Sequence, residues 1–125
     1  MAGEPILVVD DNPTNAKLAR IILEDADFTV QTAVDAEDAL RILEQFEPRL
    51  ILMDVQLPGM DGLTLTRRLR AQARFQSVWI VALTAYAMKG DDEKAYAAGC
   101  DGYLTKPIDP DALPAQVASY LARQR

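Results

Sequence analysis

The stretch "LILMDVQLPGMDG", Leu50–Gly62, decides the fold of this chain. Four apolar residues lead directly to Asp54, and a loop with Pro58, Gly59 and Gly62 follows. A short apolar run bounded by turn residues is typical of a strand buried on both faces. One aspartate at the end of such a strand could be an ordinary loop residue or a helix cap. Its meaning therefore depends on what the rest of the chain places beside it.

The composition predicts a single globular domain over residues 1–125. Half of the 125 residues are apolar, 26% are charged and the formal net charge is −6, which is typical of one folded domain. An acidic chain lacks the basic surface that attracts nucleic acids and anionic lipids, and no apolar run approaches the ~20 residues of a membrane span. We therefore predict no nucleic-acid partner and no membrane contact. We interpret the basic run Arg67, Arg68 and Arg70 as the solvated face of a helix.

Two residue types limit the chemistry of the chain. Cys100 is the only cysteine, so no disulfide forms within the chain and a reducing, cytoplasmic location is predicted. The first residues, MAGEP, lack the charged start and apolar core of a signal peptide. The chain contains no histidine, so any histidine chemistry in its function must come from a partner.

Strand-like and helix-like patterns alternate along the chain. Apolar or alternating runs predict five strands, at residues 6–10, 28–34, 50–54, 78–85 and 102–106. A helical pattern follows each strand, with Asn12 and Asp35 as predicted N-caps and Gly99 as a predicted C-cap. Because proline removes a backbone hydrogen bond, the last helix should become regular near Pro114, after a loose turn at 110–113. This (βα)5 pattern predicts an α/β fold, a doubly wound parallel sheet with helices on both faces.

Polar residues stand at the ends of four of these strands. They are Asp10 and Asp11, then Asp54, Thr84 and Lys106. The carboxyl ends of parallel strands share one edge of the sheet, where open α/β folds bind ligands. By analogy with flavodoxin-like folds we expect the strand order 2-1-3-4-5, which places the first and third strands ~4.8 Å apart. The three aspartates would then face one crevice, and the lysine is long enough to reach it from two strands away.

Three carboxylates in one crevice require a cation. Two unit charges 4 Å apart repel by about 4 kcal/mol at an effective dielectric of 20, and one ammonium does not offset three anions. Oxygen ligands suit Mg²⁺, which also binds phosphate oxygens. A carboxylate can attack phosphorus to form an aspartyl phosphate, and phosphoryl transfer needs mainly positioning and charge neutralisation. The strand ends therefore contain the groups required for phosphorylation of an aspartate.

At these residues the chain resembles a response-regulator receiver domain of two-component signal transduction. The motifs "VVDDN", "LMDVQLPGMDG", "ALTA" and "YLTKPI" occur in the order and spacing of that family. The resemblance covers roughly Ile6 to Leu121, nearly the whole chain. The chain is similar both to the receivers attached to hybrid histidine kinases and to small free-standing receivers.

The resemblance implies a role for each strand-end residue. Asp54 would accept the phosphoryl group from a phosphohistidine of a sensor histidine kinase or a histidine phosphotransfer protein. Mg²⁺ would be bound directly by Asp11, Asp54 and the backbone carbonyl of Gln56. Asp10 would act through a metal-bound water, and Lys106 would contact the phosphoryl group. No organic cofactor is implied.

The resemblance also implies a switch. Thr84 would hydrogen-bond the phosphoryl group and move toward it, and Tyr103 would turn inward, which is a population shift biased by phosphate. The face formed by the fourth helix, fifth strand and fifth helix would report this change to a downstream effector protein. Output could also pass to another histidine protein, or through a larger parent chain. The bond between Lys106 and Pro107 is expected to be cis, a minority state of about 5% for X-Pro bonds.

Two other functions use similar parts. A haloacid-dehalogenase-like, Mg²⁺-dependent phosphatase needs two acids spaced D-x-D after the first strand, whereas Asp10 and Asp11 are adjacent. A flavin or nucleotide binder would carry a neutral, Gly- or Ser/Thr-rich loop there, and "DDNPTN" is acidic. We therefore predict that the domain is not an enzyme beyond catalysing its own aspartyl phosphorylation and dephosphorylation.

Overall fold

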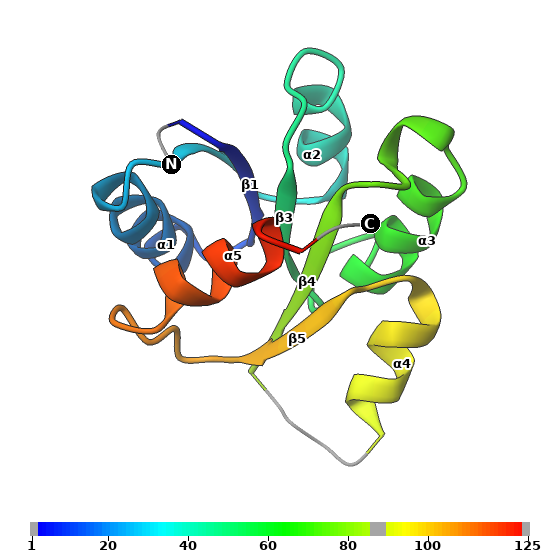
Figure 1. The fold of residues 1–125 in the computed structure, drawn as a ribbon. Helices are drawn as coiled ribbons and strands as arrows, with labels where there is room; N and C mark the ends of the chain where they lie inside the picture. Colours follow the sequence, from blue (N-terminus) through cyan, green and yellow to red (C-terminus); the bar gives the residue numbers. More distant parts are fainter. Residues whose placement is uncertain (1–2, 86–89, 124–125) are drawn as a thin grey trace.

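The computed structural model describes residues 3–85 and 90–123 (Figure 1). The strands are β1 (Pro5–Val9), β2 (Thr29–Ala33), β3 (Leu50–Asp54), β4 (Trp79–Thr84) and β5 (Gly102–Thr105). The helices are α1 (Pro13–Asp25), α2 (Ala36–Ile42), α3 (Gly62–Arg70), α4 (Asp91–Ala98) and α5 (Leu113–Leu121), with a short 3₁₀ helix η1 (Ala73–Phe75). All strands pair in parallel, in the order β2-β1-β3-β4-β5. The predicted fold class and strand order are confirmed.

Local capping signals set the helix boundaries. The Asn12 side chain accepts a hydrogen bond from Thr14 N at 2.9 Å, and Asp35 caps α2 by accepting from Asp38 N at 2.7 Å. Gly99 ends α4 with a φ of +111°, a left-handed conformation that favours glycine. These three predicted caps are confirmed. The two N-cap side chains satisfy amide groups that the first helical turn leaves without partners.

The last helix and its approach also follow the prediction. α5 begins at Leu113 with Pro114 in its first turn, and Ala112 N donates to Asp109 O at 3.1 Å in the preceding turn. The peptide bond between Lys106 and Pro107 is cis. η1 was not predicted, because a three-residue helix has no hydrophobic period to detect.

Side chains alternate between the two faces of the sheet and form a core on each. In β3, Ile51 and Met53 pack with α2, α3 and the α4 residue Ala95. Leu50 and Leu52 point to the other face and pack with α1 and α5. Figure 1 shows the helices divided in the same way, with α1 and α5 on one side of the sheet. In the part of the chain described, no helix is both long enough and apolar enough to cross a membrane.

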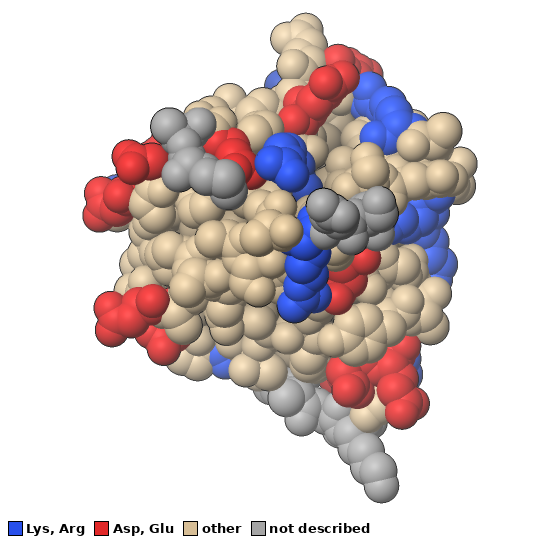
Figure 2. Space-filling view, viewed as in Figure 1, with Lys and Arg blue, Asp and Glu red and all other residues tan. Residues whose placement is uncertain are grey.

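Acidic side chains are prominent at the carboxyl edge of the sheet. In Figure 2 the lower edge, toward which the strands run in Figure 1, carries mainly acidic side chains, whereas the upper part of this face carries both acidic and basic ones. Acids that follow strands or begin helices at the carboxyl edge include Asp10, Asp11, Asp35, Asp61 and Asp91. The carboxyl edge of the sheet is therefore an acidic surface.

Arg70 is a structural anchor and not a solvated side chain. Arg67 and Arg68 are exposed as predicted, but the interpretation is wrong for Arg70, whose side chain is only 17% exposed. Its guanidinium donates to Gly99 O at 2.9 Å and pairs with Asp101 at 2.7 Å. It also donates to a carbonyl of η1 and to the carbonyl of the residue before β4, which ties the ends of α3 and α4 to the segment that enters β4. Sequence periodicity could not reveal this, because every acceptor lies on another element.

We expect Arg70→Met to lower the free energy of unfolding by about 3 kcal/mol, at the lower end for breaking a buried pair. The substitution leaves Asp101 and several carbonyl groups without their charged donor. Urea unfolding followed by circular dichroism measures the change. Arg67→Met, on the exposed face of the same helix, is the control and should change stability by less than about 0.5 kcal/mol; equal losses would contradict the anchoring role.

Candidate functional site

The ammonium group of Lys106 contacts carboxylates at the ends of two other strands, on the carboxyl edge of the sheet. Asp10 follows β1, Asp54 ends β3 and Lys106 follows β5. Lys106 Nζ lies 3.0 Å from Asp10 Oδ2 and 3.1 Å from Asp54 Oδ2. Asp10 and Asp54 are only 1% and 3% exposed, so the three charges interact in a site largely removed from water.

The second oxygen of each buried carboxylate is held by the backbone. Asn12 N donates to Asp10 Oδ1 at 2.9 Å, and Gln56 N donates to Asp54 Oδ1 at 3.0 Å. Each carboxylate is therefore held between the amide two residues further on and the lysine. The sequence indicated a role for the carbonyl of Gln56 but not for its amide, because the amide contact depends on the loop conformation after β3.

The three aspartates can approach one cation. Oxygen atoms of Asp10, Asp11 and Asp54 all lie within 4.8 Å of one another. Asp11 is exposed whereas the other two are buried, so the cluster opens to solvent on one side. An all-oxygen donor set with an open side fits Mg²⁺, which retains several waters.

Burial and neighbouring charge shift the pKa values of Asp54 and Lys106 in opposite directions. Burial raises the pKa of Asp54, and the hydrogen bond from Gln56 and the ammonium of Lys106 oppose that rise. Burial would lower the pKa of Lys106, but its contacts with Asp10 and Asp54 outweigh burial and raise the pKa. Lys106 is therefore a firmly protonated cation, and it is available to any further anion that enters the site.

Gly62 places α3 directly against the backbone of Asp54. A Cβ atom on Gly62 would lie 2.0 Å from the carbonyl oxygen of Asp54, and Gly62 N donates to Val55 O at 3.0 Å. Asp61 caps the helix by accepting from Thr64 N at 2.8 Å. The sequence indicated Gly62 only as a turn residue. The only sequence signal of such a close approach was the position of this glycine, immediately after the helix cap Asp61.

Thr84 and Tyr103 border a cavity beside the carboxylates. Thr84 ends β4 and is buried. Thr84, Tyr103 and Gln56 help to line a cavity of about 300 Å³. Burial raises the pKa of Tyr103 and the negative charge of Asp91 adds to the rise, whereas the nearby side chain of Thr84 opposes it. The two residues predicted to switch are thus brought together.

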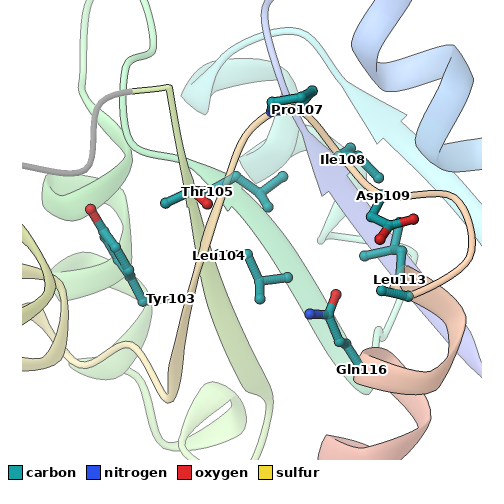
Figure 3. Close-up of a pocket in the computed structure, with 10 residues that line it drawn as sticks. Tyr103, Leu104, Thr105, Pro107, Ile108, Asp109, Leu113 and Gln116 are labelled. Carbon is teal, nitrogen blue, oxygen red and sulfur yellow. The ribbon is translucent and has the colours of Figure 1, made fainter.

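A second cavity lies on the other side of β5. It has a volume of about 340 Å³ and is bounded by β5, the turn after it and the start of α5. Figure 3 shows Leu104, Ile108 and Leu113 around it; Tyr103 also contributes to the lining, although its ring extends to the other side of the strand. This cavity and Tyr103 lie on the face predicted to report phosphorylation.

The comparisons with known proteins agree with this geometry. Residues 6–118 match the family described as the response regulator receiver domain. The response regulator Rre1 of Synechocystis sp. is 44% identical over 126 residues, which cover 98% of this chain and 54% of that protein. The polar-differentiation response regulator DivK of Brucella ovis is 35% identical over 116 residues, or 93% of this chain and 94% of DivK. The chain therefore spans about half of one relative and nearly all of another.

Solved structures give the same result. A putative response regulator from Chloroflexus aurantiacus matches with a TM-score of 0.91 and 34% identity, covering 97% of this chain and 99% of that one. Nothing in these comparisons supports the haloacid-dehalogenase-like phosphatase considered above.

We expect Gly62→Ala to slow covalent labelling of the protein by a small-molecule phosphodonor, because the added methyl group must displace either α3 or the backbone of Asp54. Such overpacking should also lower the free energy of unfolding by about 1–3 kcal/mol. The measurement is the rate of covalent labelling by a small-molecule phosphodonor in Mg²⁺.

The matched control is Gly59→Ala in the same loop. Gly59 has a φ of +74°, but a Cβ atom added to it would meet nothing within 4 Å, so alanine should strain only the loop, by about 1–2 kcal/mol. Labelling of Gly62→Ala as fast as that of Gly59→Ala would show that α3 does not position Asp54.

Proposed function

Because this chain belongs to the response regulator receiver domain family, we propose that Asp54 is the residue on which it is phosphorylated, by a phosphohistidine of a partner. The observation that carries the proposal is the ammonium of Lys106 between the buried carboxylates of Asp10 and Asp54. A phosphoryl group entering there meets a nucleophile and a cation already in place. These 125 residues contain no histidine, so the donor histidine lies outside them, on a sensor histidine kinase or a histidine phosphotransfer protein.

Mg²⁺ is the proposed cofactor. Asp11, Asp54 and the backbone carbonyl of Gln56 would hold it, and Asp10 would act through a water; the proximity of the three carboxylates supports this assignment. When bound, the ion supplies positive charge to the carboxylates and to the phosphoryl oxygens. The residues of the chain provide the rest of the chemistry.

In the proposed transfer, an oxygen of Asp54 forms a bond to phosphorus as the bond from phosphorus to the donor histidine breaks. The histidine nitrogen keeps the electron pair. Lys106 then exchanges its contact with the Asp54 carboxylate for a phosphoryl oxygen, and Thr84 donates its hydroxyl hydrogen to another. The cavity between Thr84 and Tyr103 leaves room for both side chains to shift.

The proposed domain, residues 1–125, is a signalling module. Receivers of this family act with histidine kinases and effector proteins. We propose that this one catalyses only its own phosphorylation and dephosphorylation, in the cytoplasm, and passes its state to an effector through α4, β5 and α5. Contacts with nucleic acid or membrane are not expected of it.

The first test is Asp54→Asn, which keeps the size of the side chain but removes the nucleophilic carboxylate. Labelling by a small-molecule phosphodonor in Mg²⁺ should be abolished, as measured by the mass of the intact protein. Asp111→Asn, at an exposed acid before α5, should label normally. Labelling of Asp54→Asn at an unchanged rate would refute the assignment.

We further propose that the donor contacts the outer face of α1. Leu18 and Ile21 are 41% and 49% exposed and lie one turn apart. α1 follows directly after Asp11 and Asn12, so a protein that covers this apolar pair also reaches the carboxylates. Contiguous exposed apolar side chains typically mark protein contacts.

The double substitution Leu18→Glu/Ile21→Glu should slow phosphotransfer from the protein donor by at least about tenfold and leave labelling by a small phosphodonor unchanged. The donor is found by profiling transfer from the histidine kinases of the source organism. Tyr96→Glu is the control, since Tyr96 is 50% exposed on α4. A loss of both reactions would indicate damage to the site, and a loss of neither would exclude this surface.

A further inference from the structure

The amino-terminal edge of the sheet, opposite the carboxylates, contains a groove. Leu50 and Trp79 are register partners in β3 and β4, and Trp79 N donates to Arg49 O at 3.0 Å, so the loops before the two strands lie together. Two adjoining cavities of about 270 Å³ each share Pro48, Arg49, Ser77 and Val78. One extends to Arg74 and the other to Arg123. We call this depression the arginine groove; it is defined by Pro48, Arg49, Arg74, Ser77, Val78 and Arg123.

The floor and the rim of the arginine groove differ in chemistry. Pro48 and Val78 are buried beneath it, together with Trp79, which is 9% exposed. The rim carries the exposed side chains of Arg49, Arg74 and Arg123. Glu47 is the acid at one end. A ligand here would meet an apolar surface bordered by guanidinium groups.

Two of the three arginines are held in place by uncharged groups. Arg74 donates to Leu43 O at 2.7 Å, and its guanidinium carbon lies 4.3 Å from the centre of the Phe75 ring. The guanidinium carbon of Arg123 lies 4.5 Å from the centre of the Tyr120 ring. Among residues 3–85 and 90–123 neither pairs with a carboxylate, whereas Arg49 pairs with Glu4. Arg74 and Arg123 are therefore positioned without being neutralised, and most of their donors remain available.

The combination favours one class of ligand. A free phosphate would use the guanidinium groups but not the apolar floor. A long polyanion would be repelled by the rest of a chain with a net charge of −6. A short peptide with carboxylates and an apolar side chain uses both parts, because arginine forms paired hydrogen bonds with carboxylates.

We propose that the arginine groove binds a short acidic segment of a partner protein, with an apolar side chain on Pro48, Val78 and Trp79 and carboxylates on Arg74 and Arg123. The groove lies at the opposite edge of the sheet from Asp54. A partner bound there holds the domain while the phosphorylation site stays open to its donor. The proposal does not depend on phosphorylation of Asp54.

The test uses Trp79, the single tryptophan of the chain, as a fluorescent reporter in the floor of the groove. The probes are blocked peptides of alternating glutamate and leucine, the same peptides with glutamine for glutamate, and inorganic phosphate. We expect a saturable, salt-sensitive change in Trp79 fluorescence with the acidic peptides alone. Arg74→Glu and Arg123→Glu should each weaken peptide binding by about tenfold or more, and Arg74→Lys should weaken it by less.

Arg67→Glu makes the same charge change outside the groove and should bind like the unmodified protein, as should Asp54→Asn. Thermal unfolding of each variant checks that it is folded. The proposal is overturned by any of four results: no saturable change at millimolar peptide, equal binding of the glutamine peptides, the same change with phosphate alone, or undiminished binding by Arg74→Glu and Arg123→Glu. Sedimentation at the same concentrations must show a monomer, because a signal that follows self-association would assign the groove to a second copy of this chain instead.

Discussion

The ammonium of Lys106 between Asp10 and Asp54 is the interaction on which the site depends. Two carboxylates that are almost fully buried would repel strongly, by about 4 kcal/mol at 4 Å and an effective dielectric of 20. The lysine lies 3.0 Å from one and 3.1 Å from the other, although it follows a strand two places away from that of Asp54. The order β1-β3-β4-β5 is thus what brings the lysine within reach of both carboxylates.

The two ends of the sheet are suited to different tasks. Acids gather at the carboxyl edge, where the carboxylates of Asp10, Asp11 and Asp54 lie close enough together to approach one cation. The amino edge carries arginines that uncharged groups hold in place. Because the two edges lie at opposite ends of the parallel strands, the docking proposed at the amino edge would leave the proposed phosphorylation site accessible.

Local signals predicted the framework well. Asn12, Asp35 and Gly99 act within one turn of themselves, so their capping roles follow from neighbouring residues. Arg70 shows the opposite case. Its neighbours Arg67 and Arg68 are solvated, but Arg70 reaches carbonyls and an aspartate contributed by segments up to 31 positions away. No period or motif within α3 distinguishes it from the other two.

The amino-acid sequence by itself determined the alternating strands and helices, the helix caps and the identity of the strand-end groups, because these depend on contacts between residues close in the chain. The tertiary structure decided how those groups meet. It brought Lys106 onto two carboxylates, turned the amide of Gln56 to Asp54, and set Gly62 against the Asp54 carbonyl. It also joined two loops into the arginine groove. Such contacts follow from strand order and register, which are fixed only when the whole sheet packs between its helices.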